Sequence, residues 1–266
     1  MNVCIYDKLD KNPNDYIDLN DHQILGMKNI FLNVIELRKG CNVKIGHNFI
    51  EMAIIILSGN IKVKDLKYKI EYDLKRKSVF AEKATSVFVP HYENITIEAS
   101  ETSQLIICGA FTVKANQSQS LLLSNKTITS KHVGKETYSR RVDSIIDNTI
   151  PAQNILIGET FNEQGSWSSF PSHKHDIDIE GEESCHEEVY FFKIKQKYGF
   201  GFQRIYSKDK SIDETFTVKD NCLSIIPKGY HPVVASPGTD LYYFWILSGS
   251  SRKLLMHTDP DLKPLL

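Results

Sequence analysis

The chain has 266 residues and a mass of 30.4 kDa, which allows one large domain or two of medium size, each with its own core. Its 32 Lys and Arg residues nearly balance 33 Asp and Glu residues, so the formal net charge is −1. A nucleic acid or an acidic membrane surface usually attracts a basic excess or patch, and this balance therefore argues against both partners. No apolar run approaches the roughly 20 residues needed to span a bilayer.

The first residues and the cysteines indicate the compartment. The segment MNVCIYDKLDKNPND has neither the basic region nor the apolar region of a secretory signal. The five cysteines are scattered and odd in number, and none forms a CxxC pair, so we expect no disulfide framework, thiolate metal site or redox dithiol. We therefore expect a soluble globular protein of the reducing cytoplasm.

The secondary-structure signal consists mostly of strands in two series. Runs with period-2 alternation or β-branched residues, bounded by turn residues, mark each series. The first series covers 29–37, 53–57, 61–63, 87–89, 95–98 and 104–113, and the second covers 154–161, 188–194, 200–206, 215–218, 222–226 and 241–247. Only short stretches such as 120–125 fit a helix. Many short strands with closely spaced turns predict sandwiches or barrels, and two series predict two such units.

A polar segment at 115–148 separates the two series, and we expect it to connect two domains along the surface. We place these domains at 1–125 and 126–266. The halves share a faint pattern of a strand followed by Pro and His, seen in SVFVPHYENITI and again in LSIIPKGYHPVV. A few coincident positions indicate a duplication without establishing one.

The segment GSWSSFPSHKHDIDIEGEESCHEEVYFF carries the residues suited to chemistry. His173 and His175 are two apart, so a strand would direct both imidazoles to one face. Glu187 and Glu188 precede the next predicted strand, and His231 follows a later one in PKGYH. Three imidazoles and one carboxylate suit zinc, manganese or iron(II), and leave room for a water or a substrate.

Several residues near these candidates have simpler interpretations. A His-x-His pair alone is common on exposed strands without any metal, and only the added carboxylate and the later His strengthen the hypothesis. His186 is a competing ligand whose direction the sequence leaves open. We interpret Cys185 as a packed thiol and the carboxylates at 180, 182 and 183 as a solvated acidic loop.

These motifs resemble those of the cupin superfamily. The strings GSWSSFPSHKHD, EEVYFF, FGFQRIYS, SIDETFTV, IIPKGYHPV and LYYFWILSG are similar to the 5-deoxy-glucuronate isomerases of bacterial myo-inositol catabolism, which are related to uronate ketol-isomerases. The resemblance is dense from about residue 150 to residue 255. It implies an all-β bicupin, with two cupin-type barrels and few short helices, and one divalent metal ion. Zinc or manganese is expected first, with iron as the alternative.

The family pattern also implies the ligands. Its metal glutamate directly precedes V-Y-F, which selects Glu188 over Glu187, so the implied set is His173, His175, Glu188 and His231. The first half has His47, Glu51 and His91 but no His-x-His, and we expect its barrel to be free of metal. The acidic loop is longer and the P-x-G-x-H motif is one residue shorter than in most cupins, and both features fit the isomerase group.

The implied reaction converts 5-deoxy-D-glucuronate to 2-deoxy-5-keto-D-gluconate by aldose–ketose isomerisation. A base near C2 would move a proton to C1, and Glu187 and Asp213 are the candidate catalytic residues. A hydride shift is the rival mechanism. A uronate carboxylate favours arginine, for which Arg140, Arg204 and Arg252 are candidates. Either Gln203 or Arg204 points inward, and Tyr243 is a candidate donor to sugar hydroxyls.

Other functions stay open at this point. The expected partner is a small uronic acid, and a homo-oligomer is compatible with the sequence. A pectin-type uronate ketol-isomerase would use a related substrate on the same barrel. A cupin dioxygenase would consume oxygen and need iron, and a non-enzymatic sugar-binding cupin would bind its ligand without turnover.

Overall fold

The computed structural model describes residues 5–7, 10–11, 16–24, 26–46, 49–90, 94–112 and 119–265. Within these residues the chain forms β-strands and only short 3₁₀ helices, η1 (Leu19–His22), η2 (Glu136–Tyr138) and η3 (Pro260–Leu265). The predicted all-β class is confirmed. Among the described residues, none belongs to a helix long and apolar enough for a membrane crossing.

The chain divides into two compact units that interleave along the sequence. The N-terminal unit lies within Leu9–Thr129 and Ile145–Leu156, and the C-terminal unit lies within Met1–Lys8, Ser130–Ser144 and Ile157–Leu266. The first strand, β1 (Ile5–Asp7), therefore belongs to the C-terminal unit, where it pairs with a strand more than two hundred residues later. A single boundary between residues 125 and 126 stays a prediction.

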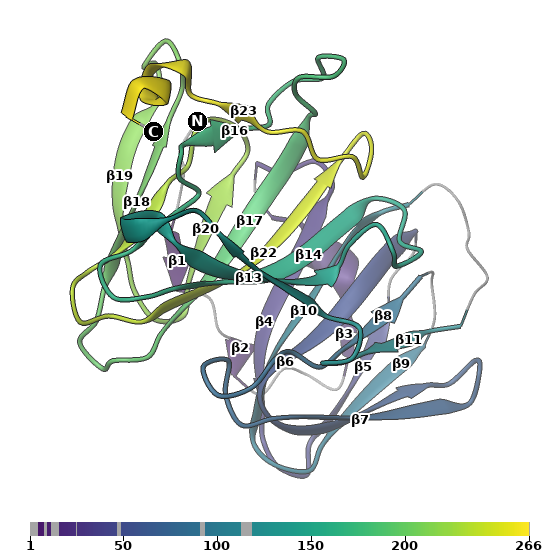
Figure 1. The fold of residues 1–266 in the computed structure, drawn as a ribbon. Helices are drawn as coiled ribbons and strands as arrows, with labels where there is room; N and C mark the ends of the chain where they lie inside the picture. Colours follow the sequence, from purple (N-terminus) through teal and green to yellow (C-terminus); the bar gives the residue numbers. More distant parts are fainter. Residues whose placement is uncertain are drawn as a thin grey trace. The chain divides into compact units, whose positions relative to one another are not determined.

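The N-terminal unit is built on one branched sheet (Figure 1). Its strand order is β2 (Asp10–Lys11), β4 (Ile30–Leu37), β10 (Ser103–Phe111), β6 (Ile50–Asp65), β9 (Ile95–Ala99), β5 (Asn42–Gly46) and β3 (Tyr16–Asp18). The strands β7 (Ile70–Arg76) and β8 (Ser86–Val89) also pair with β6, and β11 (Leu121–Leu123) pairs with β8. Strand β6 thus organises the unit by pairing with four neighbours.

Strand β6 changes its inward face along its length. Ile54 and Ile56 point into the core in the first half, whereas Ile61 and Val63 do so in the second, so the inward positions switch from even to odd. Gly59 lies between them with φ of 101°, and a Cβ there would lie 2.2 Å from the Ser103 hydroxyl oxygen. This glycine lets β6 pass from its pairing with β10 to its pairing with β9.

Glu51 accepts hydrogen bonds from backbone groups of this unit. Its side chain is fully buried, and its carboxylate accepts hydrogen bonds from the backbone N–H groups of Gln153 at 2.7 Å, Ile155 at 2.9 Å and Asn154. Backbone donors therefore satisfy a carboxylate that would be costly to bury alone. The other two candidates of this half, His47 and His91, lie outside the described residues.

The C-terminal unit contains two larger sheets and one short ribbon (Figure 1). The seven-stranded sheet has the order β1, β20 (Cys222–Ile226), β17 (His186–Ile194), β22 (Leu241–Gly249), β14 (Ile155–Asn162), β13 (Arg140–Ile146) and β12 (Thr129–Val133). The four-stranded sheet has the order β15 (Trp167–Ser168), β21 (Val233–Ala235), β18 (Gly201–Tyr206) and β19 (Asp213–Val218). The ribbon pairs β16 (His173–Lys174) with β23 (His257–Thr258).

Alternate residues of these two sheets meet in one apolar cluster. Tyr190 and Phe192 of β17 pack there with Tyr243 of β22, Ile205 of β18 and Val233 of β21. Since side chains alternate along a strand, β17 directs Glu188 to the same side as Tyr190 and Phe192. The sequence pattern of β17 thereby aims one of its two adjacent glutamates into the barrel.

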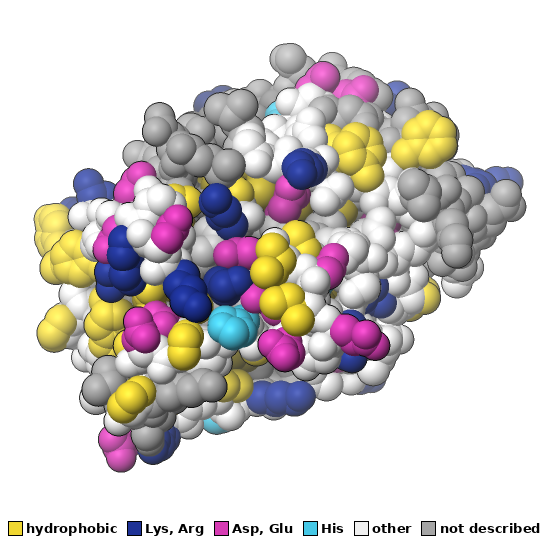
Figure 2. Space-filling model, turned by 90° about the horizontal axis from the view of Figure 1, so that it is seen from above, with side chains coloured by type: hydrophobic (Ala, Val, Ile, Leu, Met, Phe, Trp, Pro, Cys, Tyr) yellow, Lys and Arg dark blue, Asp and Glu magenta, His cyan; other side chains and the backbone are white. Residues whose placement is uncertain are grey.

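The segment 115–148, expected to be a surface connection, contributes strands instead. Strands β11, β12 and β13 lie within this segment, and β12 and β13 extend the seven-stranded sheet. Strand β12 is exposed along its whole length, which explains why its polar sequence looks like a connection. On the face seen in Figure 2, the described Lys and Arg side chains are interspersed with Asp and Glu, in keeping with the balanced composition.

Candidate metal centre

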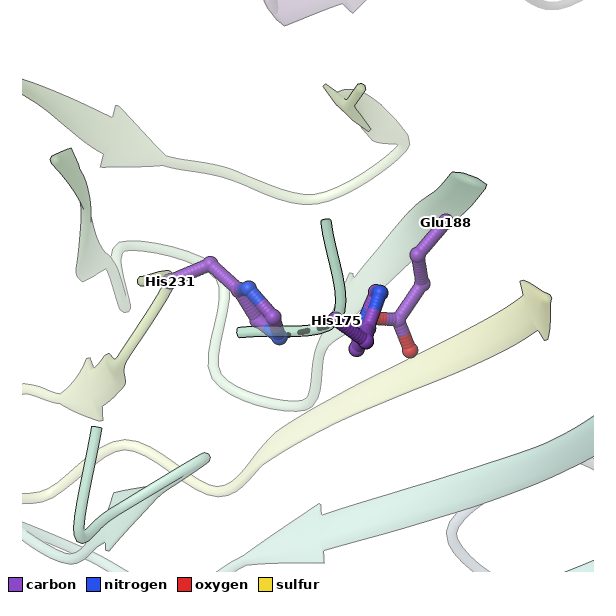
Figure 3. Close-up of side chains that lie close together, drawn as sticks. All are labelled: His175, Glu188 and His231. Carbon is purple, nitrogen blue, oxygen red and sulfur yellow. Dashed lines mark hydrogen bonds and ion pairs between the residues drawn. The ribbon is translucent and has the colours of Figure 1, made fainter. Parts of the chain in front are cut away.

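Three predicted ligands meet inside the C-terminal unit. His175 Nε2 lies 3.1 Å from Glu188 Oε2, and His231 Nε2 lies 3.2 Å from the same oxygen. All three side chains are buried, and their donor atoms lie within 4.8 Å of one another (Figure 3). They come from the residue after β16, from β17 and from the turn after β20. This arrangement could hold one small cation.

The backbone fixes which ring nitrogens face the cluster. The Nδ1 atom of His175 lies 2.9 Å from the His186 carbonyl oxygen, and that of His231 lies 2.8 Å from the Gly229 carbonyl oxygen. Because a carbonyl can only accept, each Nδ1 carries a proton, and Nε2 is the ring nitrogen that each histidine directs toward Glu188. Metal-binding histidines are held in this way by their second nitrogen.

His173 lies beside this cluster. It is half-buried on β16, its ring centroid is 5.0 Å from that of His231, and its Nδ1 lies 3.3 Å from the Pro171 carbonyl oxygen. It lines the same cavity as His175 and Glu188 but is not one of the three convergent donors. Its place as the fourth ligand stays a prediction.

The cluster shifts its own pKa values. Burial alone would raise the pKa of Glu188, but its contacts with His175 and His231 hold it well below the usual value. Burial alone would lower the pKa of His175, but the hydrogen bond and charge of Glu188 raise it above 6.5. Burial, reinforced by repulsion from His231 and His175, lowers the pKa of His173 to about 3, so this ring is neutral at neutral pH.

A cavity of about 590 Å³ opens onto His173, His175 and Glu188. Apart from these three, the charged residues in its described lining are Lys131 and Arg140. Arg140 Nη1 donates to the carbonyl oxygens of Tyr138 at 3.2 Å and Phe170 at 3.0 Å, which fixes the guanidinium at the cavity wall. Lys131 lies on β12, where the sequence offered no signal for a binding role.

Two neighbouring tyrosines, whose ring planes are tilted by 34°, also line the cavity. The ring centroids of Tyr190 and Tyr243 are 4.4 Å apart, and the Tyr190 hydroxyl lies 3.1 Å from that of Ser169. Burial, then the charge of Glu188, raises the pKa of Tyr190 well above its ordinary value, so the phenol stays neutral. Strand alternation from Glu188 could have identified Tyr190 as an inward residue.

The other candidates lie outside the cavity lining. Glu187 is on the opposite side of β17 from Glu188. Asp213 and Arg204 are exposed partners, with both guanidinium–carboxylate contacts at 2.7 Å. Arg252 is half-buried beyond β22.

Gln203 takes the inward position on β18. Its side chain is fully buried, and neither its amide oxygen nor its amide nitrogen has a hydrogen-bond partner among the described residues. Its neighbour Arg204 points outward to Asp213. Gln203 and Arg204 therefore point to opposite sides of β18, as the alternation of side chains along a strand requires.

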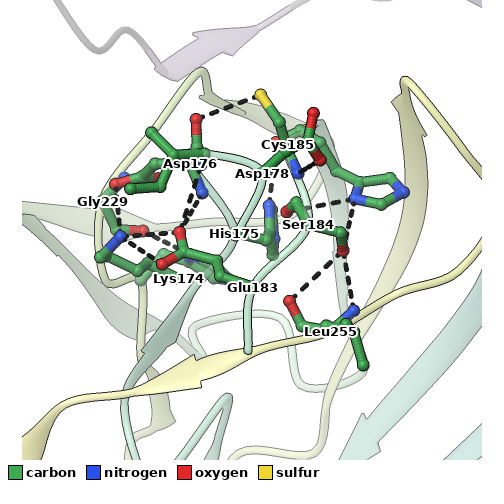
Figure 4. Close-up of polar contacts among 12 residues, drawn as sticks. Lys174, His175, Asp176, Asp178, Glu183, Ser184, Cys185, Gly229 and Leu255 are labelled. Atoms are coloured by element: carbon green, nitrogen blue, oxygen red, sulfur yellow. Dashed lines mark hydrogen bonds and ion pairs between the residues drawn. The ribbon is translucent and has the colours of Figure 1, made fainter. Parts of the chain in front are cut away.

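One expectation for the loop before β17 needs correction, and the direction of His186, which the sequence left open, is now defined. Glu180 and Glu182 are exposed, as expected of a solvated acidic loop, but Glu183 is only 2% exposed because it pairs with Lys174 (Figure 4). His186, the competing ligand, is directed elsewhere, since its Nε2 lies 2.8 Å from the Ser251 carbonyl oxygen.

The chain is similar to known proteins over nearly its whole length. The model of the KduI/IolB family matches residues 5–265. The 5-deoxy-glucuronate isomerase of Halalkalibacterium halodurans is 37% identical over 212 residues, which cover 79% of this chain and 78% of that protein. The 5-deoxy-glucuronate isomerase of Bacillus licheniformis is 36% identical over 230 residues, covering 86% and 84%.

Solved structures show the same architecture. An IolB-like protein from Salmonella typhimurium LT2 superposes with a TM-score of 0.86 and 28% identity, covering 90% of this chain and 91% of that one. The Lactobacillus farciminis oxalate decarboxylase superposes with a TM-score of 0.61 at 9% identity, covering 90% and 82%. At identity this low the likeness concerns the fold alone. The superposition confirms the predicted fold of two cupin-type barrels.

Proposed function

The chain belongs to the KduI/IolB family, and from this premise we propose that it is a metal-dependent aldose–ketose isomerase that converts 5-deoxy-D-glucuronate to 2-deoxy-5-keto-D-gluconate in myo-inositol catabolism. The observation that carries the proposal is the convergence of His175, Glu188 and His231, of which His175 and Glu188 line a cavity large enough for a sugar acid. Pockets of this size commonly hold small ligands.

His173, His175, Glu188 and His231 are the proposed metal ligands. Imidazole nitrogens with one carboxylate suit zinc, manganese and iron(II), and the fixed Nδ1 protons of the rings support this assignment. When bound, such an ion supplies a Lewis acid that stabilises negative charge on the substrate oxygens.

The positively charged side chains of the cavity lining form the proposed site of the substrate carboxylate. Arg140 and Lys131 are the positive groups outside the metal cluster in the described cavity lining. The Arg140 guanidinium keeps donors beyond the Nη1 group that Tyr138 and Phe170 engage, and it can present them to an anion. The two groups favour a uronate over an uncharged sugar.

Neutral hydroxyl groups complete the proposed site. Tyr243 and Tyr190 can donate hydrogen bonds to sugar hydroxyls, because burial raises the pKa of both phenols and keeps them protonated. Gln203 remains a proposed substrate-binding residue, since its buried amide has its hydrogen-bonding capacity unused among the described residues. We build the site without Arg204 and Asp213, which engage each other.

Proton NMR in deuterated water tests the proposal. The protein is reloaded with a divalent metal and incubated with 5-deoxy-glucuronate, with metal-stripped protein as the control. We expect conversion to the ketose only in the loaded sample, and deuterium at C1 would support proton transfer over a hydride shift. No conversion by metal-loaded protein would reject this substrate, and the pectin-type uronate, added to the same assay, would then be the first replacement.

The location and assembly of the enzyme are further parts of the proposal. The cytoplasm, where inositol breakdown would take place, is the proposed compartment. A homo-oligomer is the proposed assembly, and sedimentation of the purified protein would test it.

A further inference from the structure

The buried carboxylate of Glu183 forms hydrogen bonds with the residues on both sides of His175. Both oxygens of Glu183 accept hydrogen bonds from Lys174 Nζ, at 2.6 and 2.7 Å. One of these oxygens also accepts the backbone N–H of Asp176 at 2.6 Å and that of Ile177 at 3.3 Å (Figure 4). Glu183 thereby holds the residues immediately before and after a metal ligand.

Asp176 connects these contacts to a second proposed ligand, His231, through Gly229. Its carboxylate accepts the backbone N–H of Gly229 at 2.7 Å, and Lys174 Nζ lies 3.6 Å from its other oxygen. The Gly229 carbonyl oxygen in turn holds His231 Nδ1 at 2.8 Å. Gly229 has φ of 100°, and a Cβ there would lie 2.9 Å from the Tyr206 carbonyl oxygen, so this turn requires glycine.

The backbone of His175 connects the third ligand. The His186 N–H donates to the His175 carbonyl oxygen at 2.9 Å, and the His175 ring returns a hydrogen bond to the His186 carbonyl oxygen, also at 2.9 Å. Glu188 lies two residues further along the same strand. Three separate segments that carry ligands are therefore joined to one another without any contribution from a metal.

We propose that Lys174, Asp176 and Glu183 are positioning residues that set the spacing of His175, His231 and Glu188 before a metal ion binds. The inference rests on the proposed metal site and adds to it the residues that arrange its ligands. An ion that meets ligands already in place does not have to order three segments, and it binds more tightly for that reason. A core of apolar residues would serve stability as well as a buried ion pair, so stability alone does not explain this network.

The test compares metal binding by variants of the same loop. Glu183→Gln is measured beside Glu182→Gln, because both change one carboxylate to an amide and Glu182 is exposed. Metal-stripped proteins are titrated with Co²⁺ by calorimetry, and the visible absorption of the loaded proteins reports ligand geometry. We expect Glu183→Gln to weaken Co²⁺ binding about 10- to 100-fold, as loss of outer partners of metal ligands does, and to change the spectrum. Glu182→Gln should match the wild type.

A double variant separates positioning from stability. Glu183→Gln removes the closer of the two carboxylates that contact the Lys174 ammonium and leaves only the contact with Asp176 at 3.6 Å, which destabilises the fold. Lys174→Met combined with Glu183→Gln removes both charges and should regain much of the thermal stability, yet should still bind Co²⁺ weakly. A double variant with wild-type Co²⁺ affinity and spectrum would overturn the positioning role.

The wild-type protein distinguishes this inference from the proposed function. If the wild type binds Co²⁺ but converts no uronate, the proposed reaction fails, and the comparison of variants still decides the positioning role. If the wild type isomerises its substrate while Glu183→Gln binds Co²⁺ as tightly as Glu182→Gln, only the positioning role fails. A wild type that binds no metal would overturn both.

Discussion

His175 Nε2 lies 3.1 Å from Glu188 Oε2, while the Nδ1 atom of the same ring is held by the His186 carbonyl oxygen. The contact between Nε2 and the carboxylate is a hydrogen bond only when the ring is protonated, because otherwise both atoms are acceptors. A proton and a metal ion therefore compete for the same place between these residues. The two occupants have opposite dependence on pH.

Metal affinity should rise with pH through the range above the ordinary histidine pKa. Glu188 raises the pKa of His175 above 6.5, so this ring keeps its proton to higher pH than an ordinary histidine and must lose that proton to bind a metal. In the metal-free protein the raised pKa of His175 contributes stability that is fully present below pH 6.5 and is lost as pH rises through the raised pKa. Calorimetry in buffers of different ionisation enthalpy measures the released protons. Metal binding without proton release near pH 6.5 would contradict the competition.

Glu188→Gln and Glu187→Gln form a matched pair. Glu188 faces the two histidines, whereas Glu187 is on the opposite side of β17, so only the first change should remove a ligand. We expect Glu188→Gln to lose metal and turnover by more than the roughly 100-fold that the loss of an outer partner costs. Glu187→Gln should keep its metal. Metal analysis of both purified variants measures the difference, and the reverse result would show that the assignment of the two glutamates is wrong.

Strand periodicity and motif spacing predicted many of the strands and the two histidines that meet in the structure, whereas the choice of Glu188 over Glu187 came from the resemblance to the isomerase family. The reason for the meeting differs in detail, since β16 ends at Lys174, before His175, and alternation along one strand does not place the second ring. His175 still reaches the cluster, because Glu183 holds its two neighbours, Lys174 and Asp176.

Contacts between distant segments could not be predicted in the same way. Glu183 looks like one more carboxylate of an exposed loop, and only its pairing with Lys174, across a closed turn, buries it. Lys131 lies on an exposed polar strand whose sequence looks like a connection. Its place in the cavity lining depends on the neighbours that the folded sheet provides.

Arg140→Met should weaken substrate binding more than it slows turnover. The guanidinium is fixed at the cavity wall by Tyr138 and Phe170, so its loss removes a charged donor and leaves the metal ligands in place. A hydrogen bond to a charged group contributes roughly 1.5–3 kcal/mol, which corresponds to an increase in KM of about 10-fold or more. Arg204→Met is the control, because Arg204 pairs with Asp213 outside the cavity lining. Steady-state kinetics with an unchanged KM for Arg140→Met would reject this carboxylate site.

Glu51→Gln should destabilise the N-terminal unit without changing metal content. The buried carboxylate accepts three backbone N–H groups at the segment 153–155, and an amide offers one acceptor oxygen and places an NH₂ group against those donors. Leaving a buried donor unsatisfied costs about 1–3 kcal/mol, so the free energy of unfolding in urea should fall by about that amount. Glu101→Gln, at an exposed position, is the control and should unfold like the wild type. Metal analysis of the folded variant decides between two roles, because a loss of metal would show that Glu51 serves a second metal site and would contradict the expectation of a metal-free first barrel.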